Sequence, residues 1–189
     1  MFKGIAIVLT LLFFYMIVSD VVSTVTKKGS NSERLECHTK QTTFEYVYKK
    51  ELVSDIQNAI KSGTVEIKSK FKLSEHMQTQ LEKHINLEQV DEMIEKQINL
   101  HQGKSKSTHP LVIDYFIYEN DKEDPGKKTA KSKLYAGYLV FNFMLEGEQI
   151  YRLQIDFMDL QGKDIEEKIQ CMMKSVLTLK IQNKSKDNK

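Results

Sequence analysis

The hydrophobic pattern begins with an apolar run at the N-terminus. Residues 5–18 carry no charge, and from Gly4 through Val22 the run extends over about 19 residues. At ~1.5 Å per residue, a helix of this length nearly crosses a ~30 Å hydrocarbon layer. We expect residues 1–23 to be retained as an N-terminal membrane anchor. The alternatives are a signal peptide that is cleaved near Ser23 and a helix buried in a soluble domain.

Beyond a polar linker at residues 24–35, apolar side chains alternate with polar ones in several short stretches. Val65, Ile67 and Phe71, for example, alternate with glutamate and lysine residues. A period of two is typical of a β-strand with one buried face and one wet face. The predicted strands are residues 42–48, 64–73, 111–118, 134–145 and 149–159.

Other stretches repeat their apolar side chains every three or four residues, which is the period of an amphipathic helix. Gly63 stands where a helix that ends at Ser62 needs its C-terminal cap, and Asn86 stands where another helix needs its N-terminal cap. Ser74 is also a good N-cap. The predicted helices are residues 51–62, a segment that follows Ser74 and carries Met77, Leu81 and Ile85, a segment from Asn86 to Gly103, and a final helix from about Lys163.

The order of these elements predicts the fold class. Helices and strands are segregated, and the last two strands are joined by the short turn at 146–148, so they should pair antiparallel. We expect an α+β fold with a mostly antiparallel sheet of about five strands covered by helices, preceded by one N-terminal hydrophobic helix. The globular domain is predicted to span residues 36–180, and residues 181–189 are expected to form a basic flexible tail.

Composition narrows the class of protein. The chain has 189 residues, enough for one ordinary domain and a targeting segment. Only 8 Gly and 2 Pro are present, which excludes collagen-like and proline-rich chains. Lys and Arg number 28 against 26 Asp and Glu, so the formal charge is +2. A charge so close to zero gives no global attraction to nucleic acid or to an acidic membrane.

The two cysteines, Cys37 and Cys171, are the candidates for a disulfide, because a single pair in an exported chain is compatible with a bridge. Closing a loop of ~135 residues would stabilise the fold by about 4–5 kcal/mol on the chain-entropy model. Two unrelated thiols are the alternative if the domain is cytosolic. A catalytic cysteine is not expected, because His38 follows Cys37 directly and adjacent strand residues point to opposite faces.

Lysines gather in two places and form a candidate anion-binding face. Their counterparts could be nucleic acid, an acidic glycan or lipid headgroups, whereas the alternative is solubility and protection of an edge strand. No aromatic residues interleave with the strand lysines, so no nucleic acid partner is expected. The candidate residues are Lys68, Lys70 and Lys72 on one strand face, and Lys127, Lys128, Lys131 and Lys133 in the charged connection after residue 118.

The motifs of common active sites are missing from the sequence. The acidic stretch 119–124 does not match a calcium loop, because Pro125 and Ser132 stand where ligands belong, so we expect an exposed loop. There is no glycine-rich phosphate loop, no G-x-S-x-G turn and no C-x-x-C or H-E-x-x-H pair. We therefore assign no catalytic, cofactor-binding or metal-binding residues. The histidines are expected to be solvated or to lie at helix ends: His38, His76, His84, His101 and His109.

These observations favour an exported, membrane-tethered, non-catalytic binding module of the cell envelope, with its domain outside the cytoplasm. A short N-terminal tail followed by one apolar segment most often acts as a signal or signal-anchor. The partners would be the membrane, through residues 1–23, and another envelope protein. The alternatives are a periplasmic inhibitor or immunity-type protein, a structural subunit of an envelope machine, and an enzyme of unrecognised motif. The sequence leaves the oligomeric state open.

Overall fold

The computed structural model describes residues 35–180, apart from 108 and 128. The predicted anchor at residues 1–23, nearly all of the predicted linker and the predicted tail at 181–189 lie outside the described residues. Among the helices that are described, none is both long enough and apolar enough to cross a membrane.

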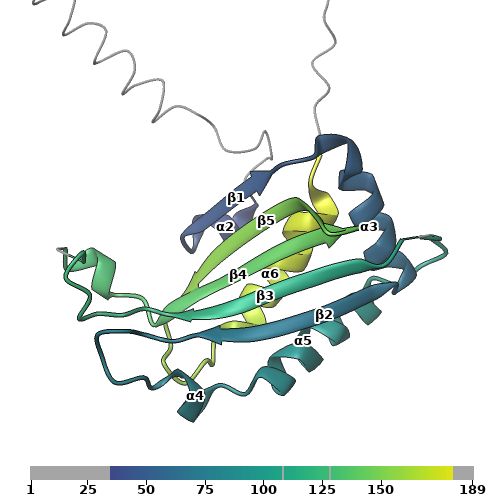
Figure 1. The fold of residues 1–189 in the computed structure, drawn as a ribbon. Coiled ribbons are helices and arrows are strands. Elements are labelled where there is room, and N and C mark those ends of the chain that lie inside the picture. Colours follow the sequence, from purple (N-terminus) through teal and green to yellow (C-terminus); the bar gives the residue numbers. More distant parts are fainter. Residues whose placement is uncertain (1–34, 108, 128, 181–189) are drawn as a thin grey trace, which may run out of the picture. The chain divides into compact units, whose positions relative to one another are not determined.

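The centre of the domain is a five-stranded sheet with the order β1-β5-β4-β3-β2 (Figure 1). Three of the four pairings are antiparallel, whereas β2 and β3 run parallel. The parallel pair arises because the chain crosses over through a helix between these strands, instead of turning back in a hairpin. The strands are β1 (Thr43–Val47), β2 (Val65–Lys72), β3 (Leu111–Glu119), β4 (Gly137–Leu145) and β5 (Glu148–Phe157).

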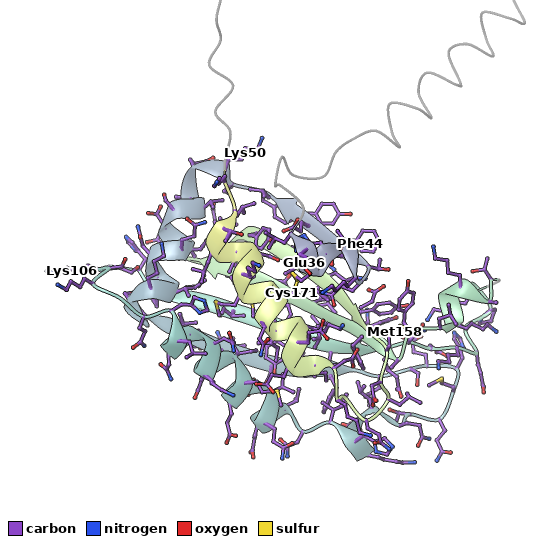
Figure 2. The ribbon with its side chains drawn as sticks, turned by 180° about the vertical axis from the view of Figure 1, so that it is seen from behind. Glu36, Phe44, Lys50, Lys106, Met158 and Cys171 are labelled. Carbon is purple, nitrogen blue, oxygen red and sulfur yellow. A yellow bond between two sulfur atoms is a disulfide. The ribbon has the colours of Figure 1, made fainter. Side chains whose placement is uncertain are left out.

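Three helices, α3, α5 and α6, cover one face of the sheet, and no described helix covers the other (Figures 1 and 2). The core lies between the helices and the sheet, where Tyr115, Phe141 and Ile169 are fully buried. The helical segments are α2 (Glu36–Thr39), α3 (Val53–Ser62), α4 (Leu81–His84), α5 (Leu87–Leu100) and α6 (Ile165–Thr178), with short 3-10 turns η1 (Lys50–Leu52) and η2 (Lys131–Lys133).

The structure confirms the predicted α+β class and the five-stranded sheet, which is mixed. Both predicted caps of the long helices are present. Gly63 ends α3 with a φ of 72°, a left-handed conformation that glycine adopts without strain. The Asn86 side chain accepts a hydrogen bond from the Gln89 backbone N–H at 3.3 Å and starts α5.

The predicted helix after Ser74 is wrong, because regular helix begins only at Leu81. The backbone N–H groups of this segment bond to two carboxylates from elsewhere in the chain. Glu119 accepts hydrogen bonds from the N–H groups of Ser74, Gln80 and Leu81, at 3.1, 2.7 and 3.2 Å. Asp121 accepts two more, from Glu75 and His76. Once these groups bond to side chains, the helical ladder is no longer needed to satisfy them.

The same contacts correct the prediction that residues 119–124 form an exposed acidic loop. Glu119 and Asp121 are only 1% and 5% exposed. Asn120 between them is also buried, and its side-chain amide donates to the Ser132 and Tyr135 carbonyls. This stretch therefore fastens segment 74–81 and the loop after β3 to the end of the sheet.

Candidate functional site

The face of the sheet that no described helix covers carries aromatic and basic side chains in rows. Residues opposite each other on paired strands point to the same face of the sheet. The strand register therefore shows which side chains form each row. One row runs from Phe44 on β1 to Lys70 on β2, and the next runs from Tyr46 to Lys68. We call this surface the open face. Its rows are Phe44, Gln154, Val140, Phe116 and Lys70; Tyr46, Arg152, Asn142, Asp114 and Lys68; and Asp156, Tyr138, Tyr118 and Lys72.

Exposed aromatic rings lie at the β1 side of the open face. Phe44 and Tyr46 are 48% and 52% exposed, and Tyr48, one residue beyond β1, is 51% exposed. Aromatic side chains have a large apolar surface, and burying that surface normally stabilises a fold. Several of them side by side on an uncovered sheet make this surface a candidate binding site.

The basic residues predicted from the sequence lie at the β2 side of the same face. Lys72 Nζ stands 4.8 Å from the centre of the Tyr118 ring, and Lys70 Nζ stands 5.9 Å from that of Phe116. The interpretation that aromatics do not accompany these lysines is therefore wrong. The rings come from β3, next to β2, and the parallel pairing of these strands was not apparent from either sequence segment.

Acidic neighbours partly neutralise two of the three strand lysines. Lys70 Nζ lies 3.5 Å from an Asp114 carboxylate oxygen, and Lys68 Nζ lies 3.3 Å from Glu66. These pairs are exposed and so contribute little to stability. Lys72 differs, because its ammonium group lies over the ring of Tyr118. It is the member of the trio whose charge is most available to a partner.

The loop lysines fall into three groups. Lys127 Nζ donates a hydrogen bond to Asn120 Oδ1, which also accepts one from the Tyr138 hydroxyl at 3.0 Å, so Lys127 joins the Lys72 end of the open face. Lys131 and Lys133 are exposed on η2. Lys128 lies outside the described residues.

Tyrosines pack together at this end of the open face. The ring centres of Tyr118 and Tyr138 are 5.7 Å apart, and those of Tyr138 and Tyr135 are 6.2 Å apart. The Tyr135 hydroxyl pairs with Thr42 Oγ1 at 2.8 Å. Tyr118, Tyr135, Tyr138 and Lys72 thus form a continuous aromatic and cationic surface. Sequence reasoning missed it, because its members come from separate strands and a loop.

A buried carboxylate lies beside these tyrosines. Asp156 occupies the same row as Tyr138 and is only 3% exposed. Burial raises the pKa of Asp156 to about 6, although hydrogen bonds from Gln154 and Thr42 act in the opposite direction. Burial, with Asp156 and two tyrosines nearby, also raises the pKa of Tyr138 to about 12. Perturbed groups on an uncovered surface mark a candidate functional site.

We expect Asp156→Asn to stabilise the protein at neutral and alkaline pH. The folded state holds the Asp156 proton more tightly than the unfolded state does, so wild-type stability falls as pH rises from about 4 through 6. The variant keeps a neutral side chain at every pH. At pH 8 its free energy of unfolding should exceed that of wild type by about 2 kcal/mol, less than the full shift would give because solvent screens part of the charge. Urea unfolding at pH 4 and pH 8 measures this difference.

At pH 4 the two proteins should unfold at nearly the same urea concentration. Asp55→Asn is the control, since Asp55 is exposed, and it should change stability by less than about 0.5 kcal/mol at either pH. An Asp156→Asn variant that is less stable than wild type at pH 8 would show that the ionised carboxylate helps to hold the fold.

A second polar group is buried on the helix side of the sheet. His38 Nε2 lies 2.6 Å from Ser175 Oγ, and His38 Nδ1 lies 3.8 Å from a Glu45 carboxylate oxygen. The Tyr151 hydroxyl donates to the same Glu45 carboxylate. Next to His38, Cys37 and Cys171 form a disulfide with an Sγ–Sγ distance of 2.05 Å, as predicted.

Ser175, His38 and Glu45 follow the order of a nucleophile, a base and an acid, but the geometry does not support nucleophilic catalysis. Ser175 is 3% exposed, so a substrate has no access to its hydroxyl. That hydroxyl donates its proton to the Cys171 carbonyl at 2.7 Å and therefore does not direct it at His38. The sequence did not indicate this group, because His38 and Ser175 are 137 positions apart.

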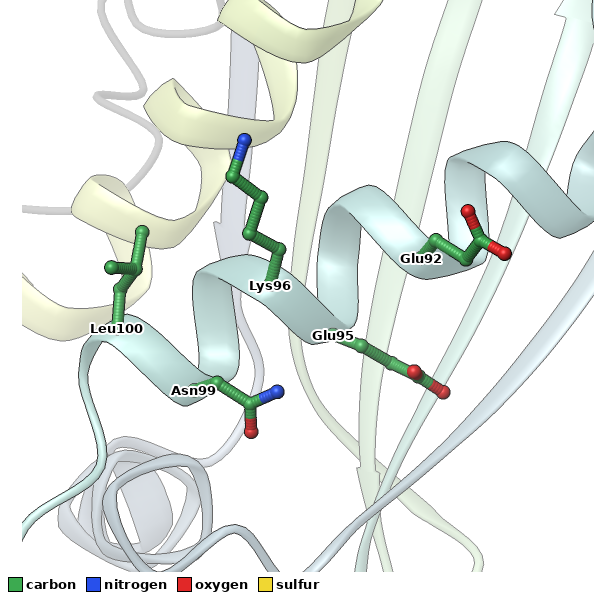
Figure 3. Close-up of a pocket in the computed structure, with 5 residues that line it drawn as sticks. All are labelled: Glu92, Glu95, Lys96, Asn99 and Leu100. Carbon is green, nitrogen blue, oxygen red and sulfur yellow. The ribbon is translucent and has the colours of Figure 1, made fainter.

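Two surface depressions lie away from both groups. The larger, about 400 Å³, is a shallow hollow along α5 (Figure 3). Lys96, on its wall, reaches Glu166 of α6 at 3.1 Å. The smaller, about 220 Å³, lies between α5 and the start of β2. The first is lined by Glu92, Glu95, Lys96, Asn99 and Leu100, and neither depression includes a residue of the three open-face rows.

Comparison of this chain with known protein families, with curated proteins and with solved structures gives no match. The function is therefore argued from the open face and from the buried groups.

Proposed function

We propose that this protein is a membrane-tethered, non-catalytic binding module of the cell envelope, whose domain binds another envelope protein through the open face. The observation that carries the proposal is the exposed aromatic edge, Phe44 and Tyr46, on a sheet face that no described helix covers. Residues 1–23 would supply the tether, and the domain would lie outside the cytoplasm. A secreted form cleaved near Ser23 is the alternative.

The chemistry of the open face favours a protein as the partner. Aromatic residues are enriched at the centres of protein interfaces, and truncating such an anchor commonly costs 2 kcal/mol or more. Lys68, Lys70 and Lys72, on the far side of the sheet, would then meet acidic groups at the rim of the partner surface. The side chains between them are aliphatic, aromatic and amide, together with Arg152 and Asp114, and such a mixed flat surface suits a broad contact better than a small ligand.

Asp156 acts on the open face indirectly. Its carboxylate is only 3% exposed, so a partner would contact its neighbour Tyr138 instead of Asp156 itself. Catalysis at Asp156 would need access for a substrate and a cleft that excludes water. The two depressions described above lie at α5, away from Asp156.

The disulfide supports a location outside the cytoplasm. Disulfides persist in oxidising compartments and are rare where thiols are kept reduced. The bridge joins residues near the two ends of the described domain. An inhibitor of a toxin or hydrolase would use the same open face, and its partner would then be the inhibited enzyme.

The test isolates the full-length protein from membranes of its native host, with matched variants on opposite faces. Phe44→Ala/Tyr46→Ala removes the aromatic edge, and Leu100→Ala removes an even more exposed apolar side chain from α5. We expect wild type and Leu100→Ala to retain one stoichiometric partner protein. The double variant should bind that partner at least ~30-fold more weakly, which corresponds to about 2 kcal/mol. The intact mass, measured without reductant, should show an uncleaved N-terminus and two fewer hydrogens from the bridge.

Equal binding by all three proteins would show that the open face is not the interface. Isolation without any stoichiometric partner would contradict a binding module. A mature N-terminus near Ser23 would replace the tethered form with the secreted one.

A further inference from the structure

The described residues place three potential metal ligands together at the disulfide. Cys37 and His38 lie on α2. Cys171, labelled in Figure 2, lies on α6. The two sulfur atoms and a ring nitrogen of His38 all lie within 4.8 Å of one another. His38 and Cys171 are 2% and 3% exposed, whereas Cys37 is partly exposed. The group is thus nearly dry, with one side open to solvent.

We infer that reduction of the disulfide converts this group into a binding site for one Zn²⁺-like cation, held by Cys37, Cys171 and His38. Two thiolates and one imidazole are ligands that zinc prefers, and a site with three protein ligands leaves the fourth position to water. Water would enter beside Cys37, the partly exposed member. Disulfide and metal exclude each other, because each uses both sulfur atoms.

The distances suit this conversion. Zinc holds sulfur at about 2.3 Å and nitrogen at about 2.0 Å, which places tetrahedral ligand atoms roughly 3.3–3.8 Å from one another. The largest present separation in the group is below 4.8 Å, so closure needs a shift of about 1 Å. When the bond between the sulfurs is broken, they move apart toward the same range. α2 is only four residues long, and reduction removes its covalent bond to α6. The contact between His38 and Ser175 remains.

The surroundings of His38 fit the second shell of a metal ligand. A metal-bound histidine normally uses its other ring nitrogen to donate to a carboxylate, a hydroxyl or a carbonyl, which fixes the ring. Ser175 Oγ lies near one nitrogen of His38, and the Glu45 carboxylate lies near the other. The nitrogen that binds the cation would give up its present partner, and the opposite nitrogen would keep one.

The chemistry balances with a dithiol as the reductant. A dithiol delivers two electrons and two protons to the Cys37–Cys171 bond and becomes a cyclic disulfide, leaving two protein thiols. Zn²⁺ then binds both sulfurs as thiolates, and two protons go to solvent. The inference does not depend on the proposed partner of the open face, which lies on the other side of the sheet.

The test reduces the purified protein with dithiothreitol, removes the reductant without air and titrates with Co²⁺, whose thiolate complexes absorb strongly. We expect one Co²⁺ for each reduced chain, displaced by Zn²⁺, and none for the oxidised chain. His38→Asn keeps a hydrogen-bonding side chain beside Ser175 and should weaken binding at least ~10-fold. His84→Asn is the control, since His84 is exposed on α4, and should bind as wild type does.

Absence of thiolate–cobalt absorption from reduced wild type would overturn the inference, as would equal binding by His38→Asn and wild type. X-ray absorption at the zinc edge of reduced wild type identifies the ligand atoms directly. Because it uses no variant, misfolding of a variant cannot affect the result. Two sulfur ligands and one imidazole are expected, and a shell without imidazole would remove His38 from the site.

Discussion

The double variant Cys37→Ala/Cys171→Ala should unfold at a much lower urea concentration than wild type, with a loss of up to about 4–5 kcal/mol in the free energy of unfolding. The bridge closes a loop between residues 134 positions apart, and a cross-link over such a distance removes much of the conformational entropy of the unfolded chain. The free energy of unfolding of natural domains is only about 5–15 kcal/mol, so this loss is a large fraction of the total stability. Urea unfolding at neutral pH, without reductant, measures it.

Reductant provides the control for the disulfide prediction. It should shift the urea midpoint of wild type toward that of the double variant and leave the variant itself unchanged. Adding Zn²⁺ to reduced wild type should restore part of the stability if the three ligands bind it, because a cation that binds only the folded state stabilises that state. Equal midpoints for oxidised wild type and the double variant would show that the bridge contributes nothing to stability.

Glu119→Ala should lower the free energy of unfolding by about 3 kcal/mol. The carboxylate accepts hydrogen bonds from the N–H groups of Ser74, Gln80 and Leu81 and from the Ser74 hydroxyl, and a buried donor without a partner costs about 1–3 kcal/mol. Some of these donors will find water in the variant, so the costs do not simply add. Hydrogen exchange of the amides in residues 74–81 should accelerate well before global unfolding.

The stabilising effect of Glu119 should be lost at low pH. Burial alone would raise the pKa of its carboxyl, but hydrogen bonds from Gln80 and Ser74 hold this pKa below the ordinary value of 4.5. The stabilising contribution is therefore complete above about pH 5 and is lost as pH falls through the lowered pKa. Glu75→Ala is the matched control, because the Glu75 side chain is exposed on the same segment, and it should leave stability nearly unchanged. If both variants unfold alike, Glu119 does not anchor the segment.

The parts of the fold that depend on local sequence were predictable. Alternation in residues 64–73 identified β2, with Ile67 toward the helices and Lys68 toward solvent. Gly63 and Asn86 marked helix ends correctly, because a cap is a property of a few neighbouring residues. The cysteine pairing was predictable as well, since only two cysteines exist.

The parts that depend on distant residues were not predictable. The neighbours of Lys70 and Lys72 on the open face come from β3, and the parallel register of β2 and β3 follows from the path of α5 across the sheet. Glu119 appeared to be a solvated loop residue, because nothing in its own surroundings shows that the N–H groups of residues 74–81 would reach it. The candidate sites combine residues that separate elements bring together, and local periodicity carries no information about that.

The pairing of β1 with β5 has a consequence for how the molecule is made. The ribosome finishes the first strand long before its neighbour exists, since Phe44 must wait for Gln154. Until then the nascent polypeptide displays an unmatched aromatic ribbon, and assembly that needs such remote partners is slow. The β1 edge of the sheet is therefore completed only after most of the described domain has been synthesised.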